Sequence, residues 1–203
     1  MLFYHRKEGK RKMKSQPVKS KAKINEIIEW MTEHRTQRDT LLFRFGINVG
    51  LRVSDILPIR YNDIYNGDGE FKEYLVVQEK KTKKEVRRIL HNKLRIHLDH
   101  YTIDRPALKD ENGYIFYSQP HPDKPVHKSR IWKVFKMVEY AMALEHFSPH
   151  SMRKTFGWHL FKVTNDIRVV QKALNHYSPA TTMLYIGIDQ MELDRALKLL
   201  SLG

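Results

Sequence analysis

His150 and Arg153 stand three positions apart, directly after the pair Ser148-Pro149. Serine is a favoured helix N-cap and proline a favoured first helical residue, so the sequence predicts a helix that begins at Pro149. On a helix, residues three apart lie on one face, and the first turn carries partial positive charge and unpaired N–H groups. The arginine adds a planar fork of donors. This arrangement predicts a binding site for an anion, with phosphate as the natural candidate.

Three further residues have side chains suited to phosphate chemistry: Arg52, His176 and Tyr185. Attack on a phosphodiester places extra negative charge on the non-bridging oxygens, so fixed cationic donors such as arginines are the main requirement. A tyrosine needs help to lose its proton, because its ordinary pKa is about 10. Taken singly, each residue also fits a structural role: Arg52 in an ion pair between helices, His176 at a helix C-terminus and Tyr185 in packing.

A lysine-rich segment lies between Arg52 and His150 in the sequence. Residues 71–90 hold two runs of β-type residues around a polar centre, which predicts a hairpin with its turn near residues 82–84. Four lysines crowd the tip of this hairpin: Lys80, Lys81, Lys83 and Lys84. An ammonium group on such a hairpin could deliver a proton to a leaving hydroxyl.

The ordered set of an arginine after "NVGL", a hairpin lysine, H-x-x-R, and L-x-H with a tyrosine nine residues later resembles the tyrosine recombinase (phage integrase) family. The resemblance runs from about residue 24 to the end of the chain and corresponds to that family's catalytic domain. It implies a mainly α-helical fold with a small antiparallel β-hairpin or sheet, which belongs to the α+β class. It assigns catalytic roles to Arg52, Lys81, His150, Arg153, His176 and Tyr185. Lys81 is preferred over the neighbouring Lys80, Lys83 and Lys84 because Lys81-Thr82 matches the lysine-threonine step of many relatives. Asp55, in "LRVSD", matches the acidic residue that supports the first arginine.

The resemblance also implies a reaction. Tyr185 would attack the DNA backbone to form a 3′-phosphotyrosine linkage, with His150 as base and Lys81 as the acid that protonates the leaving 5′-hydroxyl. His176 would donate a hydrogen bond to the scissile phosphate. Because the linkage conserves the bond energy, no ATP, metal or other cofactor is expected. His146 and His150 have i, i+4 spacing, but no nearby carboxylate or cysteine completes a set of metal ligands.

The distribution of charge favours double-stranded DNA as the partner. The formal net charge is +14, and residues 1–23 carry nine Lys or Arg against one Glu, which assigns +8 to this segment and +6 to the remainder. We expect residues 1–23 to form a flexible basic arm that contacts DNA, with a solvated charge run as the alternative. The expected DNA contacts are Lys10, Arg11 and Lys12 of the arm and Lys80, Lys83 and Lys84 of the hairpin.

Composition excludes several classes of protein. No apolar stretch approaches the roughly 18 residues of a membrane-spanning helix, and the N-terminus lacks the apolar core of a secretory signal. The absence of cysteine excludes disulfides, thiol catalysis and cysteine-ligated zinc. We expect a cytoplasmic, nucleoid-associated protein of bacterial or phage origin, encoded by a mobile element.

Apolar periodicity predicts a chain of helices. One begins near Ile24, a second ends at Gly50, a third covers about residues 93–104, and a fourth is capped by Ser129 and ends near Leu144. Four more are predicted from Pro149, over about residues 166–174, from Pro179, and over about residues 189–200. The segment GYIFYS predicts a short strand, and QPHPDKPVHK predicts a loop.

The chain differs from the usual family pattern before its catalytic domain, and two roles are possible for its C-terminal segment. Residues 1–23 leave no room for the separate core-binding domain that most relatives carry before the catalytic domain, so we expect residues 24–203 to form the catalytic domain alone. The predicted amphipathic helix in residues 189–203 would pack on a neighbouring copy in a tetramer on paired DNA sites, or on its own domain. DNA-bending accessory proteins would be further partners.

Three functions fit the sequence. The leading hypothesis is a site-specific recombinase or integrase. The second is a catalytically silent DNA-binding regulator with the same fold, since a fold does not guarantee chemistry. The third is a topoisomerase-like enzyme that nicks and closes DNA without a preferred site.

Overall fold

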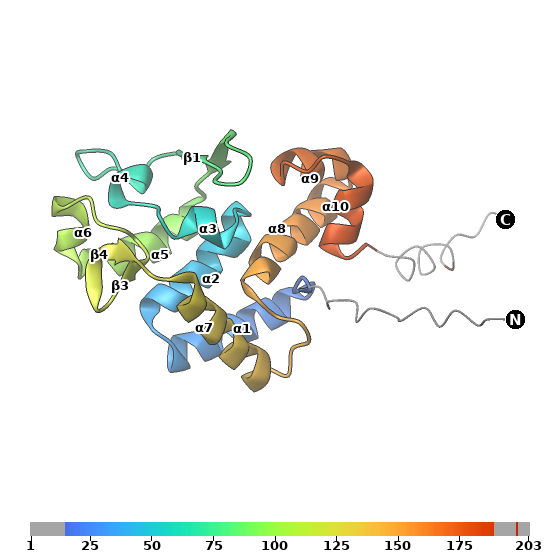
Figure 1. The fold of residues 1–203 in the computed structure, drawn as a ribbon, viewed down its shortest axis with the longest axis horizontal. Coiled ribbons are helices and arrows are strands. Elements are labelled where there is room, and N and C mark those ends of the chain that lie inside the picture. Colours follow the sequence, from blue (N-terminus) through green and yellow to red (C-terminus); the bar gives the residue numbers. More distant parts are fainter. Residues whose placement is uncertain (1–14, 189–197, 199–203) are drawn as a thin grey trace, which may run out of the picture.

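The computed structural model describes residues 15–188 and residue 198, and most of these residues lie in helices. In chain order the helices are α1 (Lys21–His34), α2 (Gln37–Val49), α3 (Val53–Ile56), α4 (Tyr61–Ile64), α5 (Asn92–Ile103), α6 (Pro106–Asp110), α7 (Lys128–Ala141), α8 (Pro149–Thr164), α9 (Ile167–Ala173) and α10 (Pro179–Ile186). The strands are β1 (Tyr74–Gln78), β2 (Glu85–Ile89), β3 (Tyr117–Ser118) and β4 (His121–Pro125). Figure 1 shows α8 between α2 on one side and α9 with α10 on the other. The predicted α+β fold class is confirmed.

Local sequence signals set the helix ends near the predicted site. Ser148 caps α8 as predicted, with its hydroxyl accepting the backbone N–H of His150 at 3.2 Å. Gly50 ends α2 in the left-handed region with a φ of 65°, and a Cβ at this position would lie 2.2 Å from the Phe156 ring. Only glycine meets both requirements without strain. Arg52 follows two residues later as the N-cap of α3.

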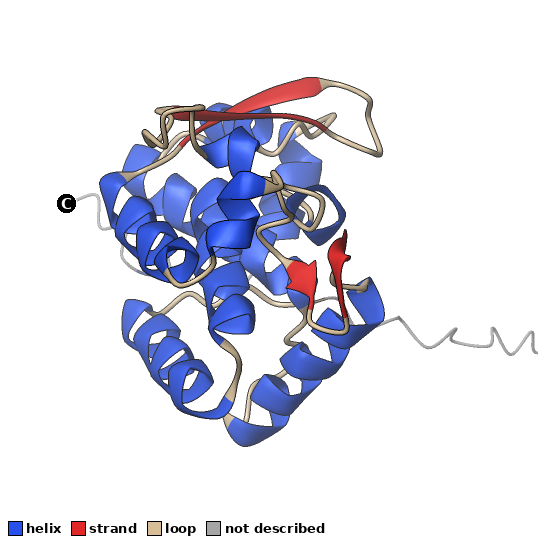
Figure 2. Ribbon diagram, turned by 90° about the vertical axis from the view of Figure 1, so that its left-hand side faces the viewer, coloured by secondary structure: helices blue, strands red, loops and turns tan. Residues whose placement is uncertain are grey.

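The predicted hairpin is formed by β1 and β2, which pair antiparallel along their full length. In the turn, the carbonyl of Glu79 accepts the N–H of Lys83, and the N–H of Glu79 donates to the carbonyl of Lys84, both at 2.9 Å. Figure 2 shows this hairpin lying along one edge of the helical body. The hairpin turn therefore lies at the side of the helical body and is not covered by the described helices.

Two local predictions were wrong. The segment with two prolines at 122 and 125, predicted as a loop, forms β4, which pairs antiparallel with β3 in an irregular register. Proline is tolerated there because a strand at the edge of a sheet has N–H groups that need no partner strand. The N-cap of α7 is His127 rather than Ser129, because the His127 ring accepts the N–H of Ser129 at 3.3 Å, and the helix ends at Ala141 rather than Leu144.

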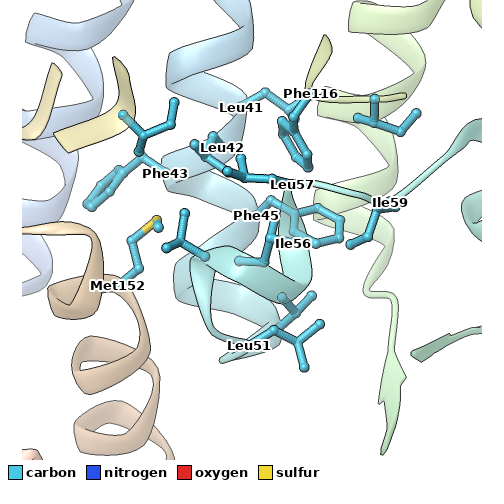
Figure 3. Packing of buried hydrophobic residues seen from close by; sticks show 14 of the residues in the cluster. Leu41, Leu42, Phe43, Phe45, Leu51, Ile56, Leu57, Ile59, Phe116 and Met152 are labelled. Carbon is cyan, nitrogen blue, oxygen red and sulfur yellow. The ribbon is translucent and has the colours of Figure 1, made fainter. Parts of the chain in front are cut away.

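The main hydrophobic core surrounds α2 (Figure 3), where Phe43 and Phe45 pack among neighbours that include Phe116 and Met152. Gly46 allows α8 to approach closely, since a Cβ at this position would lie 2.3 Å from the sulfur of Met152. Burial of these side chains is the dominant stabilising contribution, at roughly 25 cal/mol per Å² of apolar surface. The contact fixes α8, with its H-x-x-R pair, against the helix that leads to the first arginine.

A smaller apolar cluster joins α8, α9 and α10. Val170, Leu174 and Ile186 are fully buried in it, and Tyr185 is one of the partly buried residues that pack against it. Gly157 of α8 faces this cluster, and a Cβ there would lie 2.7 Å from Ile186. The position of the predicted nucleophile is thus set by how closely α10 packs on α8.

Part of the segment expected to be an arm lies on the domain. Val18 is buried and its N–H donates to the hydroxyl of Thr155 at 2.8 Å, the N–H of Gln16 donates to the carbonyl of His146, and α1 begins at Lys21. Lys10, Arg11 and Lys12 lie outside the described residues, and so does the helix predicted near residues 189–200 except for residue 198. Across the described part of the chain, no helix is long and apolar enough to cross a membrane.

Candidate active site

The two predicted arginines meet at one carboxylate. Arg52, at the start of α3, donates from Nη1 to Oε1 of Glu79 at 2.7 Å, and Arg153 of α8 approaches the same oxygen with its Nη1 at 3.5 Å. Glu79 is completely buried, Arg153 has a side-chain exposure of 2%, and Arg52 keeps 20% of its side chain exposed. Part of the Arg52 side chain thus remains open to solvent, whereas the side chains of Arg153 and Glu79 do not.

Arg153 is also built into the backbone of two other elements. Its Nη1 donates to the carbonyl of Gly50 at 2.7 Å, and its Nη2 donates to the carbonyl of Leu174 at the end of α9. Burial and the neighbouring Arg52 lower the pKa of Arg153, although an arginine stays protonated at physiological pH. Arg153 thus connects the end of α2, the end of α9 and the carboxylate of Glu79.

His176 and Tyr185 form a second contact beside the arginines. Their ring centroids are 4.7 Å apart and the ring planes cross at 83°. Nδ1 of His176 lies 3.2 Å from the hydroxyl of Thr182. Burial, together with Arg153 and Arg52, lowers the pKa of His176 to about 4, so its ring is neutral at pH 7.

Two opposing influences act on the Tyr185 hydroxyl. Burial raises the pKa of Tyr185, while the charges of Arg153 and Arg52 and a hydrogen bond from Arg153 lower it, and the net shift is upward. Lys154 lies over the tyrosine ring, with Nζ 5.0 Å from the centroid. The hydroxyl is therefore protonated in the absence of DNA and lies within electrostatic reach of three cations.

His150 lies at the exposed side of this cluster. Its ring is 6.1 Å from that of Trp132 in α7, and desolvation followed by the charges of Lys154, Arg153 and further cations lowers its pKa. A histidine with a lowered pKa is neutral near pH 7 and can accept a proton. The structure thus brings five of the six predicted catalytic residues to one region.

Lys81 is not part of this cluster. It is exposed in the hairpin turn, and within residues 15–188 no hydrogen bond or ion pair holds its side chain. Lys80, Lys83 and Lys84, the other predicted DNA contacts of the hairpin, are also exposed. Lys81 lies two residues after Glu79, so the turn connects it directly to the arginine site.

The acidic partner of the first arginine differs from the prediction. Asp55 is buried, but its Oδ1 accepts the backbone N–H of Lys80 at 3.0 Å, and its Oδ2 has no hydrogen-bond partner among residues 15–188. Asp55 therefore supports the base of the hairpin turn, and Glu79 is the carboxylate that pairs with Arg52. Among lysines, Glu79 resembles a solvated surface charge, and no signal in the sequence distinguishes it from one.

Comparison with known proteins decides the family. The family model described as "Phage integrase family" matches residues 18–192. The chain belongs to the phage integrase family. Among curated members, it is 38% identical over 175 residues to the "Probable integrase/recombinase YoeC" of Bacillus subtilis (strain 168), a match that covers 86% of this chain and 91% of that protein.

Other phage integrase family members are longer than this chain. A "Tyrosine recombinase" of Pseudothermotoga lettingae is 28% identical over 184 residues, which cover 90% of this chain and 60% of that protein. The chain spans 55% of the "Tyrosine recombinase XerC" of Thermodesulfovibrio yellowstonii.

Solved structures show the same fold. The "XerA recombinase" structure matches with a TM-score of 0.70 at 19% identity and covers 95% of this chain and 66% of that chain. The "lambda integrase catalytic core" matches with a TM-score of 0.59 at 18% identity and covers 80% of this chain and 91% of that chain. At these identities the likeness establishes the catalytic-domain fold predicted from the sequence motifs.

Proposed function

We propose that this chain is a site-specific DNA recombinase that cleaves and rejoins DNA strands through a 3′-phosphotyrosine intermediate. The observation that carries the proposal is the placement of two guanidinium groups beside the ring pair of His176 and Tyr185. Membership of the phage integrase family and the names of its relatives, integrase and recombinase, support it. A net charge of +14 suits a polyanionic substrate.

The proposed step is a transfer of one phosphoryl ester. Oη of Tyr185 forms a bond to the scissile phosphorus while the bond from phosphorus to the 5′-oxygen breaks. The phenolic proton passes to His150, whose lowered pKa keeps it neutral at pH 7. The leaving 5′-oxygen takes a proton from Lys81. Reversal with another strand's 5′-hydroxyl rejoins the DNA, so the step needs neither ATP nor an oxidant.

The arginines supply the main catalytic contribution in this proposal. Negative charge grows on the two non-bridging oxygens as the tyrosine attacks, and guanidinium donors already held in place stabilise it without reorganising. Arg153 is fixed by two backbone carbonyls, and the Arg52 side chain stays partly exposed. Loss of one such donor costs about 100- to 1000-fold in rate.

The proposed partner is double-stranded DNA, bound by several copies of the chain. Structures with this fold include the XerH recombinase bound to a palindromic difH substrate and a lambda integrase dimer bound to a core site. The proposal also includes a tetramer on paired DNA sites, contacts between copies through residues 189–203, and accessory DNA-bending proteins. The hairpin lysines Lys80, Lys83 and Lys84 and the arm residues Lys10, Arg11 and Lys12 are the proposed DNA contacts.

Covalent capture tests the proposal. Purified protein would be incubated with a pool of nicked duplexes of random sequence, and covalently attached DNA would be isolated and sequenced. The peptide that carries the nucleotide adduct would be identified by mass spectrometry. We expect a single adduct on Tyr185 that disappears in Tyr185→Phe and persists in Tyr177→Phe, a matched control because Tyr177 is completely exposed.

The same experiment separates the alternative functions. A protein that selects duplexes from the pool but forms no adduct is a DNA-binding regulator, and the catalytic proposal is then wrong. Adducts spread over unrelated sequences, together with relaxation of supercoiled plasmid, identify a nicking and closing enzyme. Enrichment of one sequence in the attached DNA supports site-specific recombination and reveals the site.

A further inference from the structure

Both carboxylate oxygens of Glu79 accept two hydrogen bonds each. Its Oε1 accepts from Arg52, at 2.7 Å, and from Arg153; its Oε2 accepts from the hydroxyl of Thr82 at 2.7 Å and from the side-chain amide of Asn175 at 2.9 Å. The side chain has no exposed surface. A buried carboxylate with four donors is held in a single place, because any movement would leave a charge unsatisfied.

The four donors come from four different parts of the fold. Arg52 precedes α3, Arg153 belongs to α8, Thr82 lies in the hairpin turn and Asn175 follows α9. Two of them are sequence neighbours of further predicted catalytic residues, since Thr82 follows Lys81 and Asn175 precedes His176. One carboxylate therefore connects the two arginines, the turn that carries Lys81 and the segment that leads to His176.

The charge balance around Glu79 is positive. The guanidinium groups of Arg52, Arg153 and the partly buried Arg88 all interact with the single carboxylate of Glu79. Arg88 extends the same network, because it donates to the carbonyls of Val49 at the end of α2 and Ala173 at the end of α9. Glu79 thus stabilises neighbouring guanidinium groups at close range without cancelling the attraction for a phosphate.

We propose that Glu79 is a positioning residue that holds the two arginines, the Lys81 turn and the segment before His176 as one unit, so that hairpin docking and assembly of the phosphate pocket are a single event. The inference rests on the proposed function, because the reaction that Glu79 would affect is the proposed cleavage of DNA by Tyr185. Glu79 contacts no reacting atom in this view and acts through the residues that it binds.

Two variants separate the connections that Glu79 makes. Glu79→Gln keeps the size of the side chain and removes its charge, which weakens all four contacts. Thr82→Val removes the hydroxyl that donates to Glu79 and accepts from Asn175, which breaks the connection to the turn and leaves both arginine contacts in place. Its melting temperature would be measured beside the rates. Glu85→Gln is the matched control, because Glu85 is an exposed carboxylate of the same hairpin.

Leaving-group chemistry provides the readout. Single-turnover adduct formation would be measured on a duplex with the normal 5′-oxygen and on one with a bridging 5′-sulfur, whose thiolate leaves without a proton from Lys81. For Thr82→Val we expect slower reaction on the oxygen substrate and a normal rate on the sulfur substrate. For Glu79→Gln we expect a loss of about 100-fold on oxygen and only partial recovery on sulfur, because the arginines are displaced as well.

The results that overturn the inference are distinct from those that overturn the function. A Glu79→Gln rate within twofold of the unchanged protein, or equal losses on the two substrates, shows that Glu79 does not couple the arginines to the turn. A general loss of structure would lower the melting temperature and slow both substrates equally.

Amide hydrogen exchange tests the unit without any reaction. We expect Glu79→Gln to speed exchange at Lys83 in the turn and at His176 together, relative to Glu85→Gln. Faster exchange at one of these sites alone overturns the inference. If the unchanged protein forms no adduct, the proposed function fails, and the exchange measurement still decides the role of Glu79.

Discussion

The rings of His176 and Tyr185 meet edge to face, with centroids 4.7 Å apart and planes at 83°. This geometry is a favourable one for aromatic pairs, which prefer separations of about 4.5–7 Å. Tyr185 is therefore held beside the arginines of its own chain before any DNA is bound. The contact also constrains the histidine ring, and the remaining hydrogen bonds of that ring decide where its proton lies.

The hydrogen bonds around Thr182 fix the tautomer of His176. The Thr182 hydroxyl donates its only proton to the carbonyl of Ser178 at 2.9 Å, so it can only accept from Nδ1 of His176. A neutral His176 therefore carries its proton on Nδ1 and has a bare Nε2. To donate from Nε2 to a phosphate oxygen, the ring must take up a second proton.

We predict that DNA binding is coupled to proton uptake at His176. The pKa of His176 is about 4 in the free protein, and the charge of a bound phosphate would raise it. Affinity for the selected duplex should then increase as the pH falls from 8 to 5.5. The dependence would be measured by fluorescence anisotropy in the Tyr185→Phe background, with and without His176→Gln. Gln donates without protonation, so an identical pH dependence in both proteins would contradict the prediction.

We also predict that His176 makes the fold sensitive to acid. The pKa of His176 in the folded protein, about 4, lies below the ordinary value of 6.5, so the unfolded chain binds the proton more readily. Stability is then greatest above pH 6.5 and falls as the pH drops toward 4, by at most about 3 kcal/mol from this group. Urea unfolding at pH 7.5 and 4.5 checks this. The decrease should be smaller in His176→Gln, and equal decreases in the two proteins would refute the assignment.

The two arginines should differ in what they contribute to stability. Arg153 is buried and donates to two backbone carbonyls and Glu79, whereas Arg52 is part-exposed and donates to Glu79. Both arginines are partners of the buried Glu79, so losing either one removes part of its pairing. Arg153 also loses its hydrogen bonds to two backbone carbonyls, and a hydrogen bond to a charged group contributes about 1.5–3 kcal/mol.

We therefore expect Arg153→Gln to lower the free energy of unfolding by about 2 kcal/mol more than Arg52→Gln does. Both variants should lose at least about 100-fold in adduct formation. Urea titration and single-turnover kinetics measure the two effects, with the exposed Arg168→Gln as the stability control. Equal destabilisation by the two variants would show that the backbone contacts of Arg153 are energetically unimportant.

Local sequence signals predicted much of this site. Ser148 and Pro149 fixed the start of α8, and Gly50 fixed the end of α2, because caps and left-handed positions depend on only a few neighbouring residues. Those two ends position His150, Arg153 and Arg52. The spacing of the motifs was sufficient to assign the chain to one family, and the fold was predicted from that family.

Contacts between distant segments were the part that sequence could not predict. Glu79 lies among lysines and resembles a solvated charge, yet partners 27 and 74 residues away bury it completely. Asp55 was expected to support Arg52, but the hairpin turn takes its carboxylate instead. β4 was missed because its prolines favour a loop, and only the pairing with β3 makes it a strand.

Gly157 provides a test of how α8 positions the nucleophile. A Cβ at this position would lie 2.7 Å from Ile186 and 3.0 Å from Leu174, so alanine forces these neighbours to shift, and we expect α10 to move away from α8. Alanine also gains about 1 kcal/mol of helix propensity, which offsets part of the roughly 1–3 kcal/mol cost of overpacking. Gly157→Ala should therefore lose little stability.

Its effect on catalysis should be much larger, because Tyr185 precedes Ile186 in α10 and would move with it. A shift of about 1 Å at a reacting group can cost about 100-fold in rate. Single-turnover adduct formation and urea unfolding would be compared for Gly157→Ala and Gly67→Ala, a control position with no atom within 4 Å of the added Cβ. The double variant Gly157→Ala, Ile186→Ala lacks the clash with Ile186. Its rate should therefore be close to the rate of Ile186→Ala alone. If Gly157→Ala reacts within twofold of the unchanged protein, the packing of α10 on α8 does not set the position of Tyr185.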